Sequence, residues 1–330
     1  MSTNTRALNP DVVKTALDKI FFDSYNKKKI SGHVDHADTR VFNQESINNR
    51  AETISTIYQG IGEFVGTAEE SDYAETNFEQ GPKRAIGFSK FTNSVKITEE
   101  LESDDMWSVV KRHVSDLGRQ AMKTKNRIRF DLWRGAFDAT ETILSEVGSE
   151  KYLVADNNAT LNGDTVDNKS QVAFGEASID DLFTKLYTQL QHDGTIDEGQ
   201  VASTLLIPTA LHKEACVLLD TEKVVGSNNN DINYYSNKYD ISLATSRYIG
   251  SQIPSGTTDP VFGDIAQGSD TAHFLLGDEH RVMSYTRKAL ETNFRAKEYS
   301  DNGTSKYLAS FRDGQEAVDF LGVTGSDGTV

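Results

Sequence analysis

The chain of 330 residues contains a single cysteine and no long apolar segment, and these absences exclude several classes of protein. One cysteine, Cys216, cannot form an intramolecular disulfide. No apolar run approaches the roughly 20 residues that a membrane helix needs. The opening residues, MSTNTRALNPDVVK, lack the apolar core of a signal peptide. We therefore expect a soluble intracellular protein with no membrane partner.

Apolar residues and positive charge are also in short supply. Hydrophobic residues make up 37% of the chain and the mean hydropathy is -0.52. A good part of the chain is therefore expected to lie in arms or loops that are buried only against neighbouring molecules. The 34 basic residues are outnumbered by 50 acidic ones, which gives a net charge of -16 and a pI near 4.9. This balance argues against a protein whose main task is to bind nucleic-acid phosphates.

The common catalytic motifs are missing as well. The sequence contains no G-x-x-x-x-G-K-[ST], G-x-S-x-G or H-E-x-x-H. Gly60, Gly62 and Gly66 lie too far apart for a G-x-G-x-x-G dinucleotide loop. Cys216 falls in the apolar pattern of a helix, so we interpret it as a small core residue. His212, one turn earlier, does not by itself make a catalytic pair with it.

Two segments resemble metal sites but lack the necessary ligands. The pair His33 and His36 has no third ligand nearby, so both are interpreted as surface residues. In the loop DNNATLNGDTVDN, a calcium register with Gly163 at position six puts Lys169 where a bidentate glutamate is required. We interpret it as a turn-rich surface loop. The sequence thus predicts no catalytic, cofactor-binding or metal-binding residues, and no cofactor.

A soluble acidic hydrolase or nucleotide enzyme is the alternative from a different functional class. It lacks a nucleophile, metal or phosphate motif at suitable spacing. Substitution of Asp156, Asp164 and Asp167 together with broad activity screening would test it. We expect no activity, and we predict that the protein is not an enzyme.

What the sequence does contain is one long amphipathic stretch, from Glu99 to Phe137. Ser103 can cap its start and Gly135 can end it, so the pattern predicts a single helix over 104–134, roughly 45 Å long. A helix with one apolar stripe needs a broad support. A sheet is favoured over a coiled coil because the heptad is interrupted near 124–125. The stripe consists of residues spaced by three, four or seven: Trp107, Val110, Val114, Leu117, Ala121, Ile128 and Leu132.

The same helix is basic in a chain that is acidic overall. Asp116 and Asp131 oppose eight basic residues over 111–134, so the net charge is 8 - 2 = +6. The charge indicates either a solvated face, with cations favoured toward the helix C-terminus, or a face turned toward acidic neighbours or a polyanion. The basic residues are Lys111, Arg112, Arg119, Lys123, Lys125, Arg127, Arg129 and Arg134.

Shorter elements precede the long helix. A short amphipathic helix is predicted near 12–21, and a second helical segment is predicted from about 44 to 60. The glycine-bounded, acidic span 60–84 is expected to protrude as a hairpin or loop. Its return strand, over 86–97, alternates apolar and polar residues and leads directly into the long helix.

The second half of the chain mixes helices and strands. Ser178 and Asp181 occupy capping-box positions at the start of a helix over 178–191. A short apolar strand over 204–207 is followed by a helix over 210–219, which indicates an α/β layer. From residue 272 the pattern is all strand, and these late strands are expected to form the bed for the long helix. They cover 273–277, 281–286, 290–298 and 306–312.

The order of these parts resembles the major capsid proteins of tailed bacteriophages, the Hong Kong ninety-seven type of shell protein. The resemblance covers nearly the whole chain from about residue 45. It depends on a co-linear series of segments rather than on one strict signature. The segments are FSKFTNSVKITEELESDD, DLWRGAF, STLLIPTALHKEACVLLDTEKVVG, YDISLATSRYI and HFLLGDEHRVMSYTRKALETNFR.

The resemblance implies an α+β phage major capsid protein fold. It has a long spine helix on a β-sheet in a peripheral domain, an α/β axial domain, an extended β-hairpin loop and an N-terminal arm. Some members are joined by a lysine–asparagine isopeptide bond aided by a glutamate. Here Lys83 lies in the loop, but Lys306 stands where the asparagine is expected and no glutamate matches, so the crosslink is not carried over. The implied divisions are 1–50 (arm), 51–98 (extended loop), 99–150 (peripheral domain with the spine helix), 151–271 (axial domain) and 272–330 (peripheral-domain strands and C-terminal tail).

The function implied by the resemblance is that of a major head protein of a double-stranded DNA bacteriophage. Such a protein self-assembles into pentamers and hexamers of an icosahedral shell around the genome. The implied partners are other copies of itself, portal and scaffolding or decoration proteins, and non-specifically packaged DNA. Its location would be the virion capsid, after assembly in the host cytoplasm. The alternative within the same architecture is an encapsulin-like nanocompartment shell.

Overall fold

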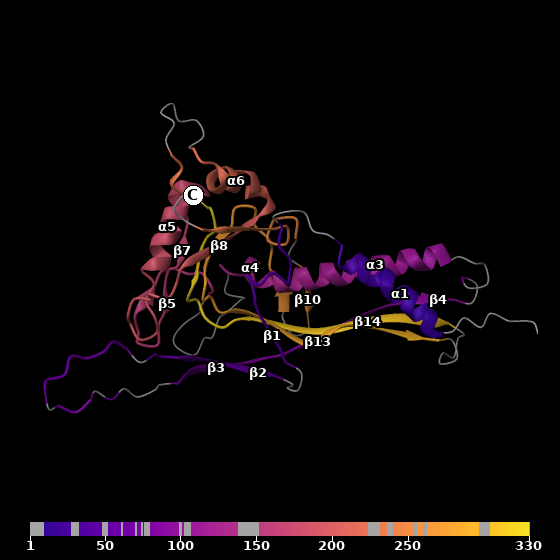
Figure 1. Cartoon of the computed structure of the whole chain (residues 1–330), viewed down its shortest axis with the longest axis horizontal. Coiled ribbons are helices and arrows are strands. Elements are labelled where there is room, and N and C mark those ends of the chain that lie inside the picture. The colour runs from indigo at the N-terminus through magenta and orange to yellow at the C-terminus, as the bar shows by residue number, and fades with distance from the viewer. Residues whose placement is uncertain are drawn as a thin grey trace, which may run out of the picture.

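The computed structural model shows an elongated molecule, with a helix-covered sheet at one end and a five-stranded sheet at the other (Figure 1). Among the helices of the described residues, none combines the length and the hydropathy of a membrane-spanning segment. The structure describes residues 10–27, 33–47, 52–60, 62–69, 71–73, 75, 80–98, 101, 107–137, 152–223, 232–235, 240–253, 256–259, 263–296 and 304–329.

The sheet at the first end has four strands in the order β1-β13-β14-β4. Strand β1 runs parallel to β13, and the other neighbours are antiparallel. Along β14, buried residues such as Tyr307 and Ala309 alternate with half-exposed ones, as expected for a strand with one face covered. The strands are β1 (Asn43–Ser46), β13 (Val282–Arg295), β14 (Ser305–Ala317) and β4 (Ser89–Ile97).

The long helix α3 (Trp107–Arg129) covers one face of this sheet, as the single apolar stripe predicted (Figure 1). Val110, Val114 and Leu117 are buried there. The predicted end of the helix at Gly135 is confirmed. After a single turn residue, Phe130, a short helix α4 (Asp131–Arg134) follows, and Gly135 is its C-cap. The helical hydrogen bonds continue through this point, because Phe130 N–H donates to the Asn126 carbonyl at 3.0 Å and Arg134 N–H to the Phe130 carbonyl at 3.2 Å. The predicted cap at residue 103 lies outside the described residues. The 23 residues of α3 span about 35 Å.

The end of the long helix and α4 pack against a second core. Phe130 and Trp133 are fully buried, and both belong to a second core that includes Phe42 and Phe274. The ring centroids of Phe42 and Phe130 are 5.2 Å apart, and those of Trp133 and Phe274 are 5.1 Å apart. The aromatic residues of this last helical segment therefore pack at the junction between the two sheets.

Helix α1 (Pro10–Tyr25) packs against α3, with Leu17 and Phe21 buried between them. The helix approaches so closely that a Cβ on Gly118 of α3 would lie 2.5 Å from the Phe21 carbonyl oxygen. Asp18 of α1 also accepts hydrogen bonds from Tyr307 (2.6 Å) and from Thr292 (2.7 Å) of the sheet. The amphipathic helix predicted near 12–21 is confirmed.

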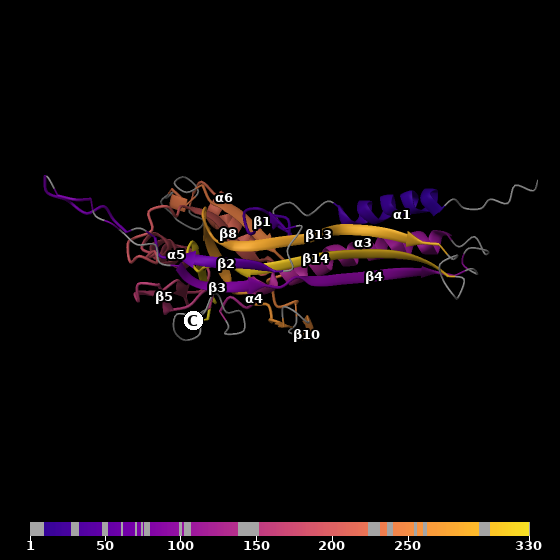
Figure 2. The same ribbon diagram turned by 90° about the horizontal axis from the view of Figure 1, so that it is seen from below.

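The helix predicted from about 44 to 60 is wrong, because this segment forms β1 and β2 (Thr53–Tyr58). Its backbone groups pair with strands that are distant in sequence, β13 and β3 (Gln80–Ile86). This long-range pairing outweighs the local helical pattern. The ribbon β2–β3 lies on the side of the four-stranded sheet opposite α3, and its connecting loop projects away from the molecule, as expected (Figures 1 and 2).

The second sheet has the order β7-β15-β12-β8-β9. Helices α5 (Glu176–Tyr187) and α6 (His212–Asp220) share a core with one of its faces, through Leu205 and Leu275. On the other face, Leu206 and Phe274 join the junction core. The strands are β7 (Lys169–Ser170), β15 (Val323–Ser326), β12 (His273–Gly277), β8 (Ala202–Pro208) and β9 (Ser242–Ser246), and the 3-10 helix η1 (Thr209–Leu211) precedes α6.

Two further predictions for this region need correction. The strand over 273–277 does not support the long helix; as β12 it is buried along its whole length in the five-stranded sheet. Its continuous apolar run reflects cover on both faces. Ser178 is not the cap of α5, which has Gly175 at that position. Ser178 is instead buried inside the helix, with its Oγ 2.6 Å from Nε2 of His273.

Two small hairpins complete the described elements. One consists of β5 (Asn158–Ala159) and β6 (Thr165–Val166), and the other of β10 (Gly256–Asp259) and β11 (Gly263–Ile265).

Candidate functional site

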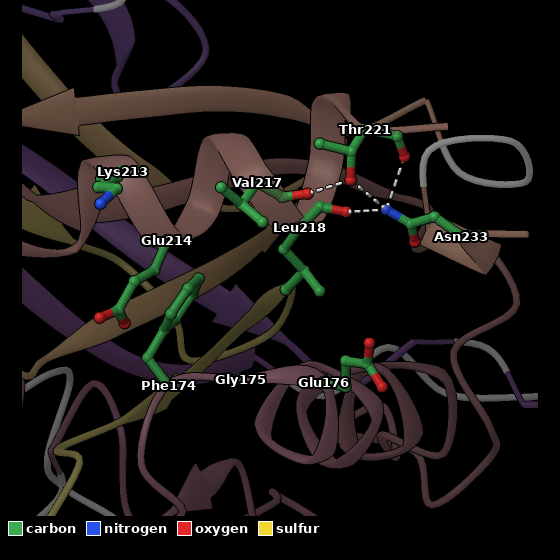
Figure 3. A pocket seen from close by; sticks show the side chains of 9 residues that line it. All are labelled: Phe174, Gly175, Glu176, Lys213, Glu214, Val217, Leu218, Thr221 and Asn233. Carbon is green, nitrogen blue, oxygen red and sulfur yellow. Dashed lines mark hydrogen bonds between the residues drawn. The ribbon is translucent and has the colours of Figure 1, made fainter. Parts of the chain in front are cut away.

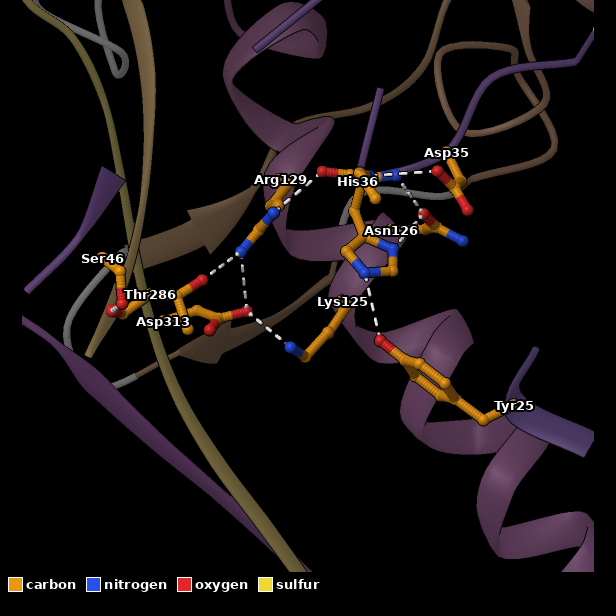
Figure 4. Close-up of polar contacts among 10 residues, drawn as sticks. Tyr25, Asp35, His36, Ser46, Lys125, Asn126, Arg129, Thr286 and Asp313 are labelled. Atoms are coloured by element: carbon orange, nitrogen blue, oxygen red, sulfur yellow. Dashed lines mark hydrogen bonds and ion pairs between the residues drawn. The ribbon is translucent and has the colours of Figure 1, made fainter. Parts of the chain in front are cut away.

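A buried polar network joins the N-terminal segment, α3 and the four-stranded sheet (Figure 4). At its centre, the carboxylate of Asp313 on β14 accepts a hydrogen bond from Nη2 of Arg129 at 3.2 Å and pairs with Nζ of Lys125 at 3.5 Å. All three side chains are at most 7% exposed. Lys125 also lies 4.8 Å from the ring centroid of Phe311. Lys125, which interrupts the apolar stripe of the helix, is therefore buried and forms an ion pair with Asp313.

His36 connects this network to α1. Its backbone N–H donates to Oδ1 of Asn126 at 2.7 Å, and its Nε2 lies 3.1 Å from the hydroxyl of Tyr25. Arg129 donates to the His36 carbonyl at 2.8 Å. Burial, reinforced by the Arg129 charge, lowers the pKa of His36 to about 4. Burial and the nearby Asp313 carboxylate raise the pKa of Tyr25 to about 12, so the histidine and the phenol are both neutral near pH 7.

The network has the properties of a structural joint rather than of a reactive centre. Its charged groups are enclosed and paired, and its hydrogen bonds reach the backbone at Ala37 and His36. The prediction that both histidines of HVDH are surface residues is wrong for His36, which is 6% exposed. His33 is half-buried, with its ring centroid 5.7 Å from that of His212. Among the described residues, no group of three or more His, Cys, Asp or Glu could hold a metal ion.

The eight basic residues of the long helix divide into a buried set, an exposed set and Arg127, which is half-buried. Lys125 and Arg129 face Asp313, and Arg134 is buried against Asp131 at 2.6 Å. Arg134 also donates to three backbone carbonyls, one of them that of Tyr248 at 2.6 Å. For these residues the interpretation as a solvated face is wrong, because they face acidic groups of their own chain. The exposed set on α3 is Lys111, Arg112, Arg119 and Lys123.

An open crevice of about 380 Å³ lies between the start of α5 and α6 (Figure 3). One of its polar side chains stabilises the end of α6. Nδ2 of Asn233 donates hydrogen bonds to the carbonyls of Leu218 (2.6 Å) and Thr221 (2.8 Å), at the C-terminus of this helix. Glu176 and Glu214 point from its two sides. Among the described residues that line the crevice, no nucleophile has an adjacent base.

Cys216 is half-buried on α6, its Sγ 3.7 Å from Nε2 of His212. Burial and the neighbouring Asp220 raise the pKa of the thiol, so the reactive thiolate is disfavoured. Nδ1 of His212 is engaged by the hydroxyl of Thr245 at 2.9 Å. The pair therefore lacks the properties of an activated nucleophile, although Cys216 is less deeply buried than the core interpretation implied.

The loop tested as a calcium site forms the β5–β6 hairpin. Gly163 lies at its turn with a φ of +94°, a conformation that favours glycine. The surface interpretation fails for Asn168, which is fully buried and donates to the carbonyls of Leu153 (2.8 Å) and Val323 (2.9 Å). No pattern in the sequence predicts this role. Asp156, Asp164 and Asp167, singled out for the hydrolase alternative, lie at or near the surface, and Asp167 is paired with Lys185.

The two lysines considered for crosslinking lie in different settings. Lys83 is exposed on β3. Lys306 lies on β14, directly between Lys96 of β4 and Arg295 of β13. The position at which the resemblance leads us to expect an asparagine is therefore occupied by Lys306, between two other basic residues.

Comparison with known proteins identifies structures that share this architecture. No protein-family model and no curated protein sequence matches the chain. Among solved structures, 186 chains match. The virus-like particle from Pyrococcus furiosus aligns with a TM-score of 0.50 at 8% identity, over 95% of this chain and 99% of that chain. The capsid of the cyanophage P-SCSP1u aligns with a TM-score of 0.50 at 11% identity, over 92% and 93% of the two chains.

Identity this low establishes the fold alone. The chain has the α+β fold of phage capsid proteins, as the resemblance in the sequence implied.

Proposed function

We propose that this chain is the major capsid protein of a tailed double-stranded DNA bacteriophage, which self-assembles into pentamers and hexamers of an icosahedral shell around the genome. The observation that carries the proposal is the near end-to-end alignment with a cyanophage capsid subunit, over 92% of this chain. The role is structural, without catalytic residues, a cofactor or a metal. The location is the virion capsid, after assembly in the host cytoplasm.

The surface of the subunit supports this proposal. The loop after β2 carries large apolar side chains in full contact with solvent, with Phe64 107% and Tyr73 94% exposed. The ribbon that carries the loop leaves the molecule rather than folding back on it (Figure 1). Exposed apolar side chains on an extended segment are typical of a subunit that completes its burial in an assembly. Closed shells need such head-to-tail contacts arranged so that rings close.

The divisions of the chain follow from the same proposal. Residues 1–50 serve as the N-terminal arm, 51–98 as the loop that extends over a neighbouring subunit, and 99–150 with 272–330 as the peripheral domain. Residues 151–271 form the axial domain around the centres of hexamers and pentamers. Portal, scaffolding or decoration proteins and packaged DNA are the further partners.

Assembly of the purified protein tests the proposal. We expect pentamers, hexamers or closed shells by analytical ultracentrifugation and electron microscopy. A protein that stays monomeric at high concentration across assembly conditions would refute it. Shells from infected or lysogenic cells should contain nuclease-protected DNA. Shells filled with protein cargo and free of a genome would instead identify the encapsulin-like alternative, which no feature of the described residues favours.

A further inference from the structure

The ribbon β2–β3 rests on the part of the chain that carries the five-stranded sheet, close to the point where the ribbon passes into its loop. Two turns support it there. The first, residues 160–164, joins β5 to β6, and the second, residues 191–195, follows α5. We call these two turns the cradle. Both views show β5 beside the ribbon (Figures 1 and 2).

The outgoing arm of the ribbon is held by a carboxylate of the second turn. The Gly62 N–H donates a hydrogen bond to Oδ2 of Asp193 at 3.2 Å. Gly60 lies against the same oxygen, since a Cβ at that position would be 2.9 Å from it. Gly60 and Gly62 have φ values of +71° and +75°, a region that favours glycine. The backbone after β2 can therefore approach Asp193 closely only because glycine stands at both positions.

The returning arm of the ribbon rests on an apolar side chain of the first turn. A Cβ on Gly81 of β3 would lie 2.8 Å from Cδ1 of Leu161. Leu161 belongs to a small apolar cluster with Ile57 of β2, Met283 and Val318. Both arms of the ribbon therefore contact the cradle, one through a hydrogen bond and the other through apolar packing.

The cradle is itself fixed to buried parts of the chain. The Asn162 N–H donates to the His192 carbonyl at 3.1 Å, which joins the two turns. Nε2 of His192 lies 2.9 Å from Oδ2 of Asp319, and both of these side chains are buried. The cradle is therefore anchored in the interior, so it can act as a fixed support for the ribbon.

The carboxylate of Asp193 is oriented by its own turn. Its Oδ1 accepts hydrogen bonds from the N–H (2.9 Å) and the hydroxyl (2.6 Å) of Thr195, which leaves Oδ2 for Gly62. Burial acts to raise the pKa of Asp193, but the hydrogen bonds from Thr195 and Gly62 outweigh it and lower the pKa. The acceptor is therefore ionised at neutral pH, and hydrogen bonds to ionised acceptors are the stronger kind.

We propose that Asp193 and Leu161 are positioning residues, which fix the direction in which the ribbon β2–β3 leaves its own subunit. The proposal deepens the shell-forming function above and depends on it. A ribbon held in one direction loses less conformational freedom when the subunit assembles, so the cradle lowers the entropy cost of assembly. A ribbon released from the cradle samples many directions, and only a fraction of the subunits is then competent to assemble.

The distance between two spin labels on the unassembled subunit tests the cradle. Cys216→Ala removes the single native cysteine, and Val65→Cys after β2 with Tyr187→Cys on α5 then supplies two exposed labelling sites. Double electron–electron resonance on this parent should give one narrow distance distribution. Adding Asp193→Ala or Leu161→Ala should broaden it. For Asp193→Ala, the ratio of held to released ribbon should fall about fivefold to tenfold, as expected for one lost hydrogen bond.

The matched control is Asp156→Ala, which removes an exposed carboxylate from the same part of the chain. It makes the same change in net charge and should leave the distance distribution unchanged. Thermal unfolding of the Asp193→Ala and Asp156→Ala subunits should be alike, because the proposed role concerns the direction of the ribbon rather than the stability of the fold. Equal distribution widths for the two variants, or a broad distribution in the parent, would overturn the proposal.

Assembly provides the second measurement, on chains without labels. Asp193→Ala should raise the protein concentration required for assembly about fivefold, because fewer subunits hold the ribbon in the competent direction. Asp156→Ala should assemble as the wild type does. A broadened distance distribution with unchanged assembly would overturn the positioning role. A wild type that forms no oligomer would refute the proposed function instead, and the label distances would still decide whether the cradle holds the ribbon.

Discussion

Removal of the Asp313 carboxylate is expected to destabilise the subunit more than any surface charge change. In the wild type, Lys125 and Arg129 lie 3.5 and 3.2 Å from the Asp313 carboxylate. Asp313→Ala leaves both cations buried without this counter-charge. Breaking a buried pair in this way costs about 3–5 kcal/mol. The entropy of unfolding is about 2.1 cal/mol/K per residue, or near 0.7 kcal/mol/K for 330 residues. The thermal unfolding midpoint of the variant should therefore fall by roughly 4–7 °C.

Urea unfolding of the unassembled subunit, followed by tryptophan fluorescence, measures this loss. Asp116→Ala is the matched control, because Asp116 forms an ion pair with Arg119 in which both side chains are about half exposed. It should cost less than about 1 kcal/mol. Adding Lys125→Met to Asp313→Ala should recover part of the loss, since one unpaired buried cation is removed. An Asp313→Ala loss no larger than that of Asp116→Ala would refute the interpretation of the network as a buried joint.

Two further predictions concern the attachment of α1. The pKa of His36 is lowered from 6.5 to about 4 in the folded chain, so the unfolded chain binds the proton more tightly. As the pH falls from 6.5 to 4, the free energy of unfolding should therefore decrease by about 3 kcal/mol. His36→Gln should remove this part of the pH dependence in urea titrations at pH 7 and 4; an unchanged profile would contradict the assignment. Gly118→Ala should cost about 1–3 kcal/mol despite its better helix propensity, because the new Cβ meets the Phe21 carbonyl. Gly66→Ala, with no atom near the new Cβ, is its control and should change the stability by less than about 0.5 kcal/mol.

Local patterns in the sequence were sufficient for several elements. The stripe of Val110, Val114 and Leu117 predicted both the helix and its broad support, because a helix places residues three and four apart on one face. Alternation predicted the strands 86–97 and 306–312, and glycine with acidic residues predicted the protruding loop. The shortage of apolar residues predicted segments with exposed surface, such as the loop that carries Phe64. Each of these depends on neighbours within about ten residues.

The candidate joint could not be found in this way. Asp313 lies 188 residues from Lys125, so only the folded chain shows that this charge in the stripe has a partner. Strand register likewise brings Lys96 and Lys306 together, although they are 210 residues apart. The interruption of the stripe near residues 124–125 is the only trace of this joint in the local sequence pattern.

The amphipathic helices, the exposed acidic loop and the absence of known catalytic motifs can be predicted from the amino-acid sequence alone, because these depend on residue type and short spacing. The strands near 44–60 and the place of the run 273–277 in the second sheet become visible only in the folded chain. The same is true of the burial of His36 and of the charges that oppose each other. Those outcomes depend on strand pairing and packing between segments that are tens to hundreds of residues apart. A local sequence pattern does not show which distant segments will pair, and their contacts outweigh local propensity.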